Sequence, residues 1–361
     1  MDSAVVQQEK SSKGYSGLKI AGVVLTLCGV ALFAYFVYEA GFNEIRDGVV
    51  RFGFAGFAVI LFLYFLRICV RSYAWKLSVY EHDGLRLRDA IPAVVIGEAL
   101  SSMLPLGILI SGTSKAVAVR KRIPLVVAMS SVATENLFFS FITGIFLVSG
   151  AVLALRAFAL DESLIVTINF LIAIVVALSV FGVAAVIRQW HIASETCEWI
   201  YKRGFFRKVL ENGRLDVRLF ENLLYGFYRR YPQRFIPICL LEAAYHGIGI
   251  AEVWFVLSRL TAGSPSLVTA FILESVSRMI IVLFKLIPFV IGVDEAGAQF
   301  IANSMALAAG VGLTLAIIRK GRVLFWTGLG IVLIVKRGLT FKQITETNAR
   351  GFSSQMIEGD Q

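Results

Sequence analysis

The stretch from Leu267 to Phe300 reads LVTAFILESVSRMIIVLFKLIPFVIGVDEAGAQF, and it decides the fold because it is apolar enough for a bilayer yet carries charges. Its charged residues are Glu274, Arg278, Lys285, Asp294 and Glu295. A charge at the bilayer centre costs about 2.5–3.5 kcal/mol, and three in one span would cost about three times as much if they faced lipid. These side chains must therefore face one another, a polar partner or a water-filled cavity. Pro288 and Gly292 predict a broken helix here.

The composition of the whole chain is that of a polytopic membrane protein. Of its 361 residues, 57% are hydrophobic and 17% are charged, whereas soluble domains have about 45–50% apolar and about 25% charged residues. Apolar runs of about 20 residues, the length of a spanning helix, recur along it. The expected spans are about 18–38, 54–75, 124–155, 163–187 and 235–260. The sequence thus predicts an all-α, polytopic transmembrane helical bundle.

The segment Ala90–Val119 is predicted to be a re-entrant hairpin. Pro105 and Gly107 interrupt its centre, because proline removes a helix hydrogen bond and glycine loosens the backbone. Basic residues precede and follow the segment, so the positive-inside rule places both of its ends in the cytoplasm. Irregular backbone at that depth requires protein or water around it.

The chain is expected to have five parts. They are a disordered tail (1–17), a first transmembrane half (18–187), a basic cytoplasmic amphipathic linker (188–234), a second transmembrane half (235–340) and a C-terminal tail (341–361). The topology after residue 266 stays open. If Ser266–Ile287 crosses the whole membrane, the basic cluster Arg319–Arg322 lies on the non-cytoplasmic side, which contradicts the positive-inside rule. If Leu267–Phe300 is a second hairpin, the cluster is cytoplasmic and the last apolar run is short for a span.

The linker holds ten Lys/Arg and five Asp/Glu, and the net charge of the chain is +10. That balance indicates cytoplasmic loops and anionic lipid rather than nucleic acid. Leu215, Leu219, Leu223 and Phe227 share one helical face of the linker. Either an amphipathic helix on the cytoplasmic leaflet or a solvated linker fits this pattern.

The candidate binding residues lie in both halves. Glu274 and Arg278 are four residues apart and can form an ion pair on one helical face, and Lys285 lies two turns further on. One acidic residue cannot pair with both cations, so the second cation is left for Asp294, Glu295 or a lipid phosphate. Both a structural ion-pair network and one that also contacts substrate fit this pattern. In the first half the candidates are Glu98, Lys115 and Glu135.

Two further pairs leave alternatives open. Glu242 and His246, one turn apart, could handle protons or could make an ordinary interhelical hydrogen bond. Arg67 and Arg71 could contact headgroups or snorkel to the cytoplasmic surface, and their place near a helix end favours snorkelling.

The two halves share a plan that suggests a pseudo-repeat. Glu98 precedes Ser101, Glu274 precedes Ser277, and a Pro/Gly break follows each pair. Interrupted segments in corresponding halves are the best sequence pointer to the binding site of a transporter.

The order of these motifs resembles a known family. The first group is the run Leu104-Pro105-Leu106-Gly107, then Gly112, Lys115 and Glu135; the second is Ile287-Pro288, then Gly292, Glu295 and Gly297. Together they resemble the lysylphosphatidylglycerol synthase transmembrane-region (flippase-like) family over about residues 15–340, close to its hopanoid-biosynthesis-associated branch. Where that family often has Gly-Glu, this chain has Gly112-Thr113, so no role of that carboxylate transfers.

The resemblance implies a multi-pass inner (plasma) membrane protein, with a cytoplasmic N-terminus, that moves a polar or anionic lipid between leaflets for envelope lipid or glycolipid synthesis. Arg278 and Lys285 would hold the headgroup, and the acidic residues would counter-charge the cavity. The alternative is a non-transporting accessory protein that docks a lipid-modifying or glycosyltransferase enzyme. Signatures such as G-x-S-x-G, H-E-x-x-H and the P-loop are missing, so we expect no enzyme activity, cofactor or metal.

Overall fold

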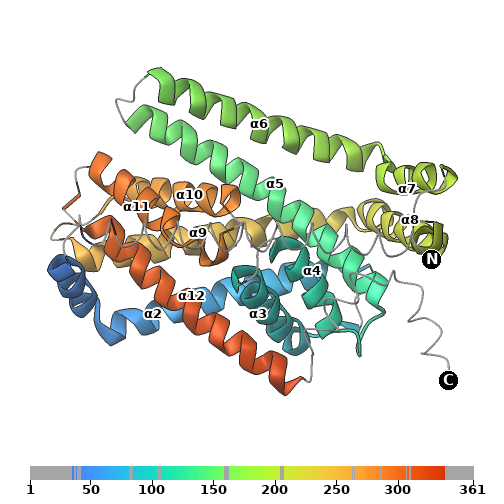
Figure 1. Cartoon of the computed structure of the whole chain (residues 1–361), viewed down its shortest axis with the longest axis horizontal. Helices are drawn as coiled ribbons and strands as arrows, with labels where there is room; N and C mark the ends of the chain where they lie inside the picture. The colour runs from blue at the N-terminus through green and yellow to red at the C-terminus, as the bar shows by residue number, and fades with distance from the viewer. Residues whose placement is uncertain are drawn as a thin grey trace, which may run out of the picture.

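The computed structural model describes Tyr35, Tyr38 and residues 42–80, 84–103, 107–157, 162–203, 207–261, 263, 265–284, 287–305, 307–308 and 310–337. Over these residues the chain forms α-helices and two short 3-10 helices, and no strand occurs among them (Figure 1). The predicted all-α, polytopic helical bundle is therefore confirmed.

Four helices are long and apolar enough to cross a membrane: α2 (Phe42–Leu77), α5 (Leu125–Ala157), α6 (Glu162–Ile187) and α9 (Phe235–Leu260). They coincide with the predicted spans from residue 54 onward. The predicted first span, 18–38, lies outside the described residues except for Tyr35 and Tyr38. A kink at Gly53, with φ of 64°, divides α2, and glycine adopts this left-handed conformation without steric cost.

Each predicted broken segment consists of two helices that pack against each other. The first hairpin is α3 (Leu87–Met103) with α4 (Gly107–Ala118). The second hairpin is α10 (Leu267–Leu283), the 3-10 helix η3 (Pro288–Val290) and α11 (Val293–Ser304). Pro105 and Lys285 lie outside the described residues. The depth of either hairpin in a bilayer stays a prediction.

The last described helix corrects the sequence analysis. The basic cluster was expected to lie on one side of the membrane, before a short final apolar run, but α12 (Val311–Lys336) is one helix that includes the cluster and that run. Arg319 and Arg322 are each only 5% exposed, in the middle of this helix. Because Arg319 and Arg322 neutralise the buried carboxylates of Glu274 and Glu252, the cluster gives no basis for choosing a topology, which stays a prediction.

The basic linker forms α7 (Ile192–Lys202), α8 (Arg207–Arg230) and η2 (Pro232–Arg234). Helices α7 and α8 pack together at one end of the bundle (Figure 1). Of the predicted apolar face, Phe227 is buried in a cluster with Phe138 of α5, whereas Leu219 is 41% exposed. Part of this face therefore packs on protein, and contact of the rest with a lipid leaflet stays a prediction.

Candidate functional site

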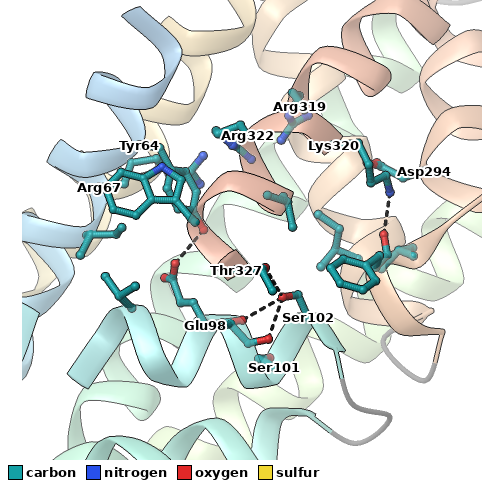
Figure 2. A pocket seen from close by; sticks show the side chains of 18 of the residues that line it. Tyr64, Arg67, Glu98, Ser101, Ser102, Asp294, Arg319, Lys320, Arg322 and Thr327 are labelled. Atoms are coloured by element: carbon teal, nitrogen blue, oxygen red, sulfur yellow. Dashed lines mark hydrogen bonds between the residues drawn. The ribbon is translucent and has the colours of Figure 1, made fainter. Parts of the chain in front are cut away.

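The two hairpins meet α2 and α12 around a polar cavity of about 200 Å³ (Figure 2). Residues of α3, α10, η3 and α11 line it, together with Tyr245 of α9. Its charged lining residues are Arg67, Arg71, Glu98, Arg278, Asp294, Arg319, Lys320 and Arg322. Six of these side chains are basic and two are acidic, so the lining suits an anion.

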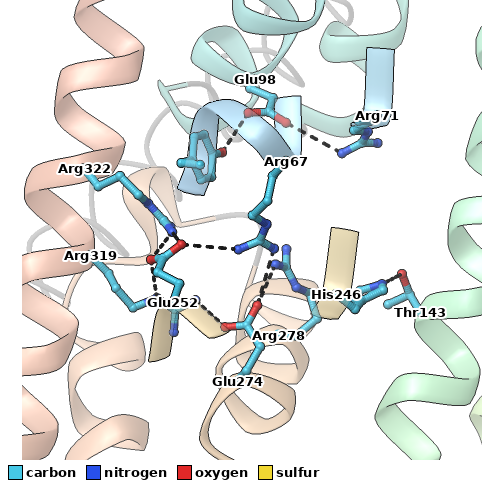
Figure 3. Close-up of polar contacts among 11 residues, drawn as sticks. Arg67, Arg71, Glu98, Thr143, His246, Glu252, Glu274, Arg278, Arg319 and Arg322 are labelled. Carbon is cyan, nitrogen blue, oxygen red and sulfur yellow. Dashed lines mark hydrogen bonds and ion pairs between the residues drawn. The ribbon is translucent and has the colours of Figure 1, made fainter. Parts of the chain in front are cut away.

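A buried ion-pair network closes one side of the cavity (Figure 3). Glu274 is 0% exposed, and its oxygens lie 2.7 Å from Arg319 Nη2, 3.1 Å from Arg278 Nη2 and 3.4 Å from Arg67 Nη2. Glu252 of α9 pairs with Arg322, and its oxygens lie 3.8 Å from Arg67 Nη1 and 4.0 Å from Arg319 Nε. Four guanidinium groups thus share two carboxylates.

Aromatic rings and one glycine complete this network. The guanidinium carbon of Arg67 lies 4.1 Å from the Tyr245 ring centre, and that of Arg322 lies 4.3 Å from the Tyr64 ring centre. Such cation–π contacts stabilise a desolvated cation. A Cβ at Gly249 would lie 2.5 Å from Glu274 Oε1. A residue without a side chain is therefore needed there for α9 to approach the network.

A second network joins the first hairpin to α2 and α5. Arg71 Nε lies 2.9 Å from Glu135 Oε1, and Arg71 Nη1 lies 3.9 Å from Glu98 Oε1. Lys115 Nζ of α4 lies 3.7 Å from the other oxygen of Glu135. The Tyr64 hydroxyl donates to Glu98 at 2.7 Å. Thus Arg67 of α2 reaches the second hairpin, and Arg71, one turn later, reaches the first.

A lysine fixes the turn of the second hairpin. Lys320 Nζ donates to the carbonyl oxygen of Phe289 at 2.6 Å and lies 3.2 Å from Glu295 Oε1 (Figure 2). The other oxygen of Glu295 accepts from the Gly292 amide at 2.7 Å and caps α11. Phe289 and Val290 have φ of 55° and 49°, which is rare for residues with a side chain and rarest for a β-branched one. Such strain persists where surrounding contacts hold it, and it clusters at ligand sites.

Several polar atoms at the cavity have no hydrogen-bond partner among the described residues. They are Nε of Arg67, Arg278, Arg319 and Arg322, Nε1 of Trp326 and Oδ1 of Asp294. Buried polar groups are nearly always hydrogen-bonded. Five of these six buried atoms are donors and one is an acceptor, so the unsatisfied groups around the cavity are mostly donors.

The structure brings together most of the predicted site residues. Glu98, Arg278 and Asp294 line the cavity, and Glu274 and Glu295 lie just behind it. Lys115 and Glu135 belong to the second network, whereas Lys285 lies outside the described residues.

Glu242 and His246, the predicted pair on α9, do not hydrogen-bond to each other. His246 bonds instead to Thr143 Oγ1 of α5 at 3.0 Å (Figure 3). This contact corresponds to the interhelical alternative.

Sequence reasoning missed most of the basic lining, because only Arg278 of its six basic residues was predicted to bind substrate. Arg67 was expected to snorkel to the surface, but its side chain is 1% exposed and paired, so that interpretation is wrong. Glu252 was given no role, and Arg319, Lys320 and Arg322 were interpreted only as a basic cluster that bears on the topology. The available signal was the spacing of Arg319 and Arg322, which puts both on one helical face.

A second cavity lies on the other face of the second hairpin. It has a volume of about 580 Å³ and is bounded by α5, α6, α10 and α11. Val276, Met279 and Ala296 are among its lining residues, nearly all of which are apolar. The hairpin thus separates a polar cavity from an apolar one.

These features define a polytopic α-helical membrane protein with a buried ionic cavity between two broken-helix hairpins. Residues 19–330 match the family described as lysylphosphatidylglycerol synthase TM region. The chain therefore belongs to this family, which ties it to lipid biosynthesis or translocation, and the resemblance predicted from its motifs is confirmed. Its association with hopanoid synthesis stays a prediction. Comparisons with curated proteins and with solved structures found no match.

Proposed function

We propose that this protein moves a lipid with an anionic headgroup between the two leaflets, acting as a transporter and not as an enzyme. The headgroup would occupy the polar cavity, and the acyl chains would remain in apolar surroundings. The observation that carries the proposal is the lining of that cavity, in which six basic side chains face two acidic ones.

The unsatisfied donors support an oxygen-rich anion in particular. Arg278 is 13% exposed and pairs with Glu274 through one guanidinium nitrogen, Nη2. Its Nε has no hydrogen-bond partner among the described residues. Arginine donates in parallel to two oxygens of a carboxylate or phosphate. Arg278 and Arg322 could therefore bind a headgroup without giving up their ion pairs.

The apolar cavity favours a lipid over a soluble anion. It shares α10 and α11 with the polar cavity, so an acyl chain could lie on one face of the second hairpin while the headgroup lies on the other. A soluble anion would gain nothing from this apolar surface, whereas the acyl chain of a lipid could lie against it without leaving apolar surroundings.

The test uses purified protein in phosphatidylcholine vesicles that contain tail-labelled phosphatidylglycerol or tail-labelled phosphatidylcholine. Translocation is measured as the loss of the label to a membrane-impermeant quencher. We expect the anionic lipid to move faster. Arg278→Gln should slow it by about 10- to 100-fold, because a hydrogen bond to a charged group contributes about 1.5–3 kcal/mol.

The matched control is Lys336→Gln, which removes an exposed cation from the last turn of α12. It should leave the rate unchanged. Arg278→Gln is expected to fold, because Glu274 keeps Arg67 and Arg319 as partners. The proposal fails if neither lipid moves, or if Arg278→Gln moves lipid at the original rate. If cells instead lose function when Arg218 of the linker is neutralised and tolerate Arg278→Gln, the protein is an accessory that docks an enzyme.

A further inference from the structure

One buried acid takes no part in either ion-pair network. Glu242 lies on α9, is 0% exposed, and neither of its carboxyl oxygens has a hydrogen-bond partner among the described residues. An ionised carboxylate in such a place loses its hydration and gains nothing in return. An unpaired ionisable residue within a membrane-spanning helix is for that reason a candidate functional site.

The titratable groups that act on Glu242 all belong to the second network or to its own helix. They are Arg71 from α2, Lys115 from α4, Glu135 from α5 and the Cys239 thiol one turn earlier on α9. Helices α10 and α12 and the 3-10 helix η2 also pack against α9. Of their charged groups, Arg278, Arg319 and Arg322 engage Glu252 and Glu274, and Lys320 engages Glu295. Arg234 of η2 donates to the carbonyl oxygens of Leu77 and Val79.

The balance of charge determines which form of Glu242 this arrangement accommodates. Arg71 and Lys115 already neutralise Glu98 and Glu135, so two cations face two carboxylates. An ionised Glu242 would be a third carboxylate without a cation of its own. The neutral acid, which carries a proton, fits the geometry as it stands.

We propose that Glu242 is a proton-binding site, and that exchange of its proton controls how tightly the first hairpin is held. When the O–H bond breaks, the proton passes to water and the electron pair stays on the carboxylate. That anion then competes with Glu98 and Glu135 for Arg71 and Lys115. The competition weakens the contacts that tie α3 and α4 to α2 and α5, because Glu98 is on α3 and Lys115 is on α4.

The control of lipid movement rests on the function proposed above, whereas the proton site does not. Two measurements therefore separate them. The first uses purified protein without added substrate and compares the infrared spectra of the original chain and Glu242→Gln, a neutral variant of almost the same shape. We expect the variant to lose one carbonyl band of a protonated carboxylic acid. The control Glu162→Gln, at an exposed acid in the first turn of α6, should lose none.

The second measurement follows translocation of labelled phosphatidylglycerol in vesicles as a function of pH. The original chain should change its rate by up to about tenfold per pH unit across the titration of one proton. Glu242→Gln should lose that dependence, and Glu162→Gln should keep it.

Three results would overturn the proposal. If Glu242→Gln retains every protonated-acid band, there is no proton site. If Glu242→Gln moves lipid with the original pH profile, Glu242 does not regulate translocation, while the proposed function stands. If the protein moves no lipid at any pH, both the function and this control fail, and the band alone would still identify the proton site.

Discussion

Replacing Glu274 by glutamine tests whether the central ion-pair network holds the second hairpin. The substitution keeps the shape of the side chain and removes its charge, so four guanidinium groups are left with only Glu252. At an effective dielectric constant of about 20, each contact at 2.7–3.4 Å represents about 5–6 kcal/mol of attraction before desolvation is subtracted. Removing one partner of a buried ion pair costs about 3–5 kcal/mol in total. We expect Glu274→Gln to lower the free energy of unfolding by that amount.

The comparison with Arg278→Gln makes the prediction sharper. Removing Arg278 leaves three guanidinium groups on two carboxylates, so it relieves repulsion as well as losing an attraction. It should therefore cost less than Glu274→Gln does. The double variant should then be more stable than Glu274→Gln alone, with a coupling of about 0.5–3 kcal/mol.

The assay is equilibrium unfolding in mixed micelles, with sodium dodecyl sulfate as denaturant and the fluorescence of the five tryptophans as the signal. Glu162→Gln serves as the control, and it should cost less than about 1 kcal/mol because its carboxylate only faces a helix N-terminus. The reasoning is refuted if Glu274→Gln and Arg278→Gln destabilise equally, or if the double variant is less stable than Glu274→Gln alone.

Three other predictions concern packing, reactivity and the apolar cavity. A Cβ at Gly330 would lie 2.4 Å from Ala99 Cβ, so Gly330→Ala should separate α12 from α3 and cost about 1–3 kcal/mol in the same titration. Burial, and secondarily Glu221, raises the pKa of the Cys197 thiol in α7, so mass spectrometry should show slower alkylation at neutral pH than for a free cysteine peptide. Ala296→Phe should partly fill the apolar cavity and slow lipid translocation in vesicles without exposing the polar one.

The sequence predicts the helices well and the site only in part, for a physical reason. Apolar length alone identifies α5, α6 and α9, because a bilayer leaves few alternatives to a spanning helix. A charged residue, by comparison, does not reveal from the sequence whether it faces water or a buried partner. Arg319 has the same sequence neighbours whether it faces water in a loop or Glu274 in a helix. Its partner lies 45 residues earlier in the chain. Only tertiary packing distinguishes these two environments.

The same reasoning explains why the two arginines of α2 were misassigned. Their place near a helix end predicted contact with water, but α9, α3 and α12 pack against α2. Arg67 lies 3.4 Å from Glu274, and Arg71 lies 3.9 Å from Glu98. Each glutamate lies on the first helix of its hairpin and contacts one of these two arginines. A repeat that relates the two halves stays a prediction. Because a helical turn advances about 5.4 Å, a shift of either hairpin that breaks its contact need not break the other. Independent release of one hairpin is what alternating exposure of a cavity between two leaflets requires, and the partners of Arg71 make the first hairpin the one that a proton on Glu242 would control.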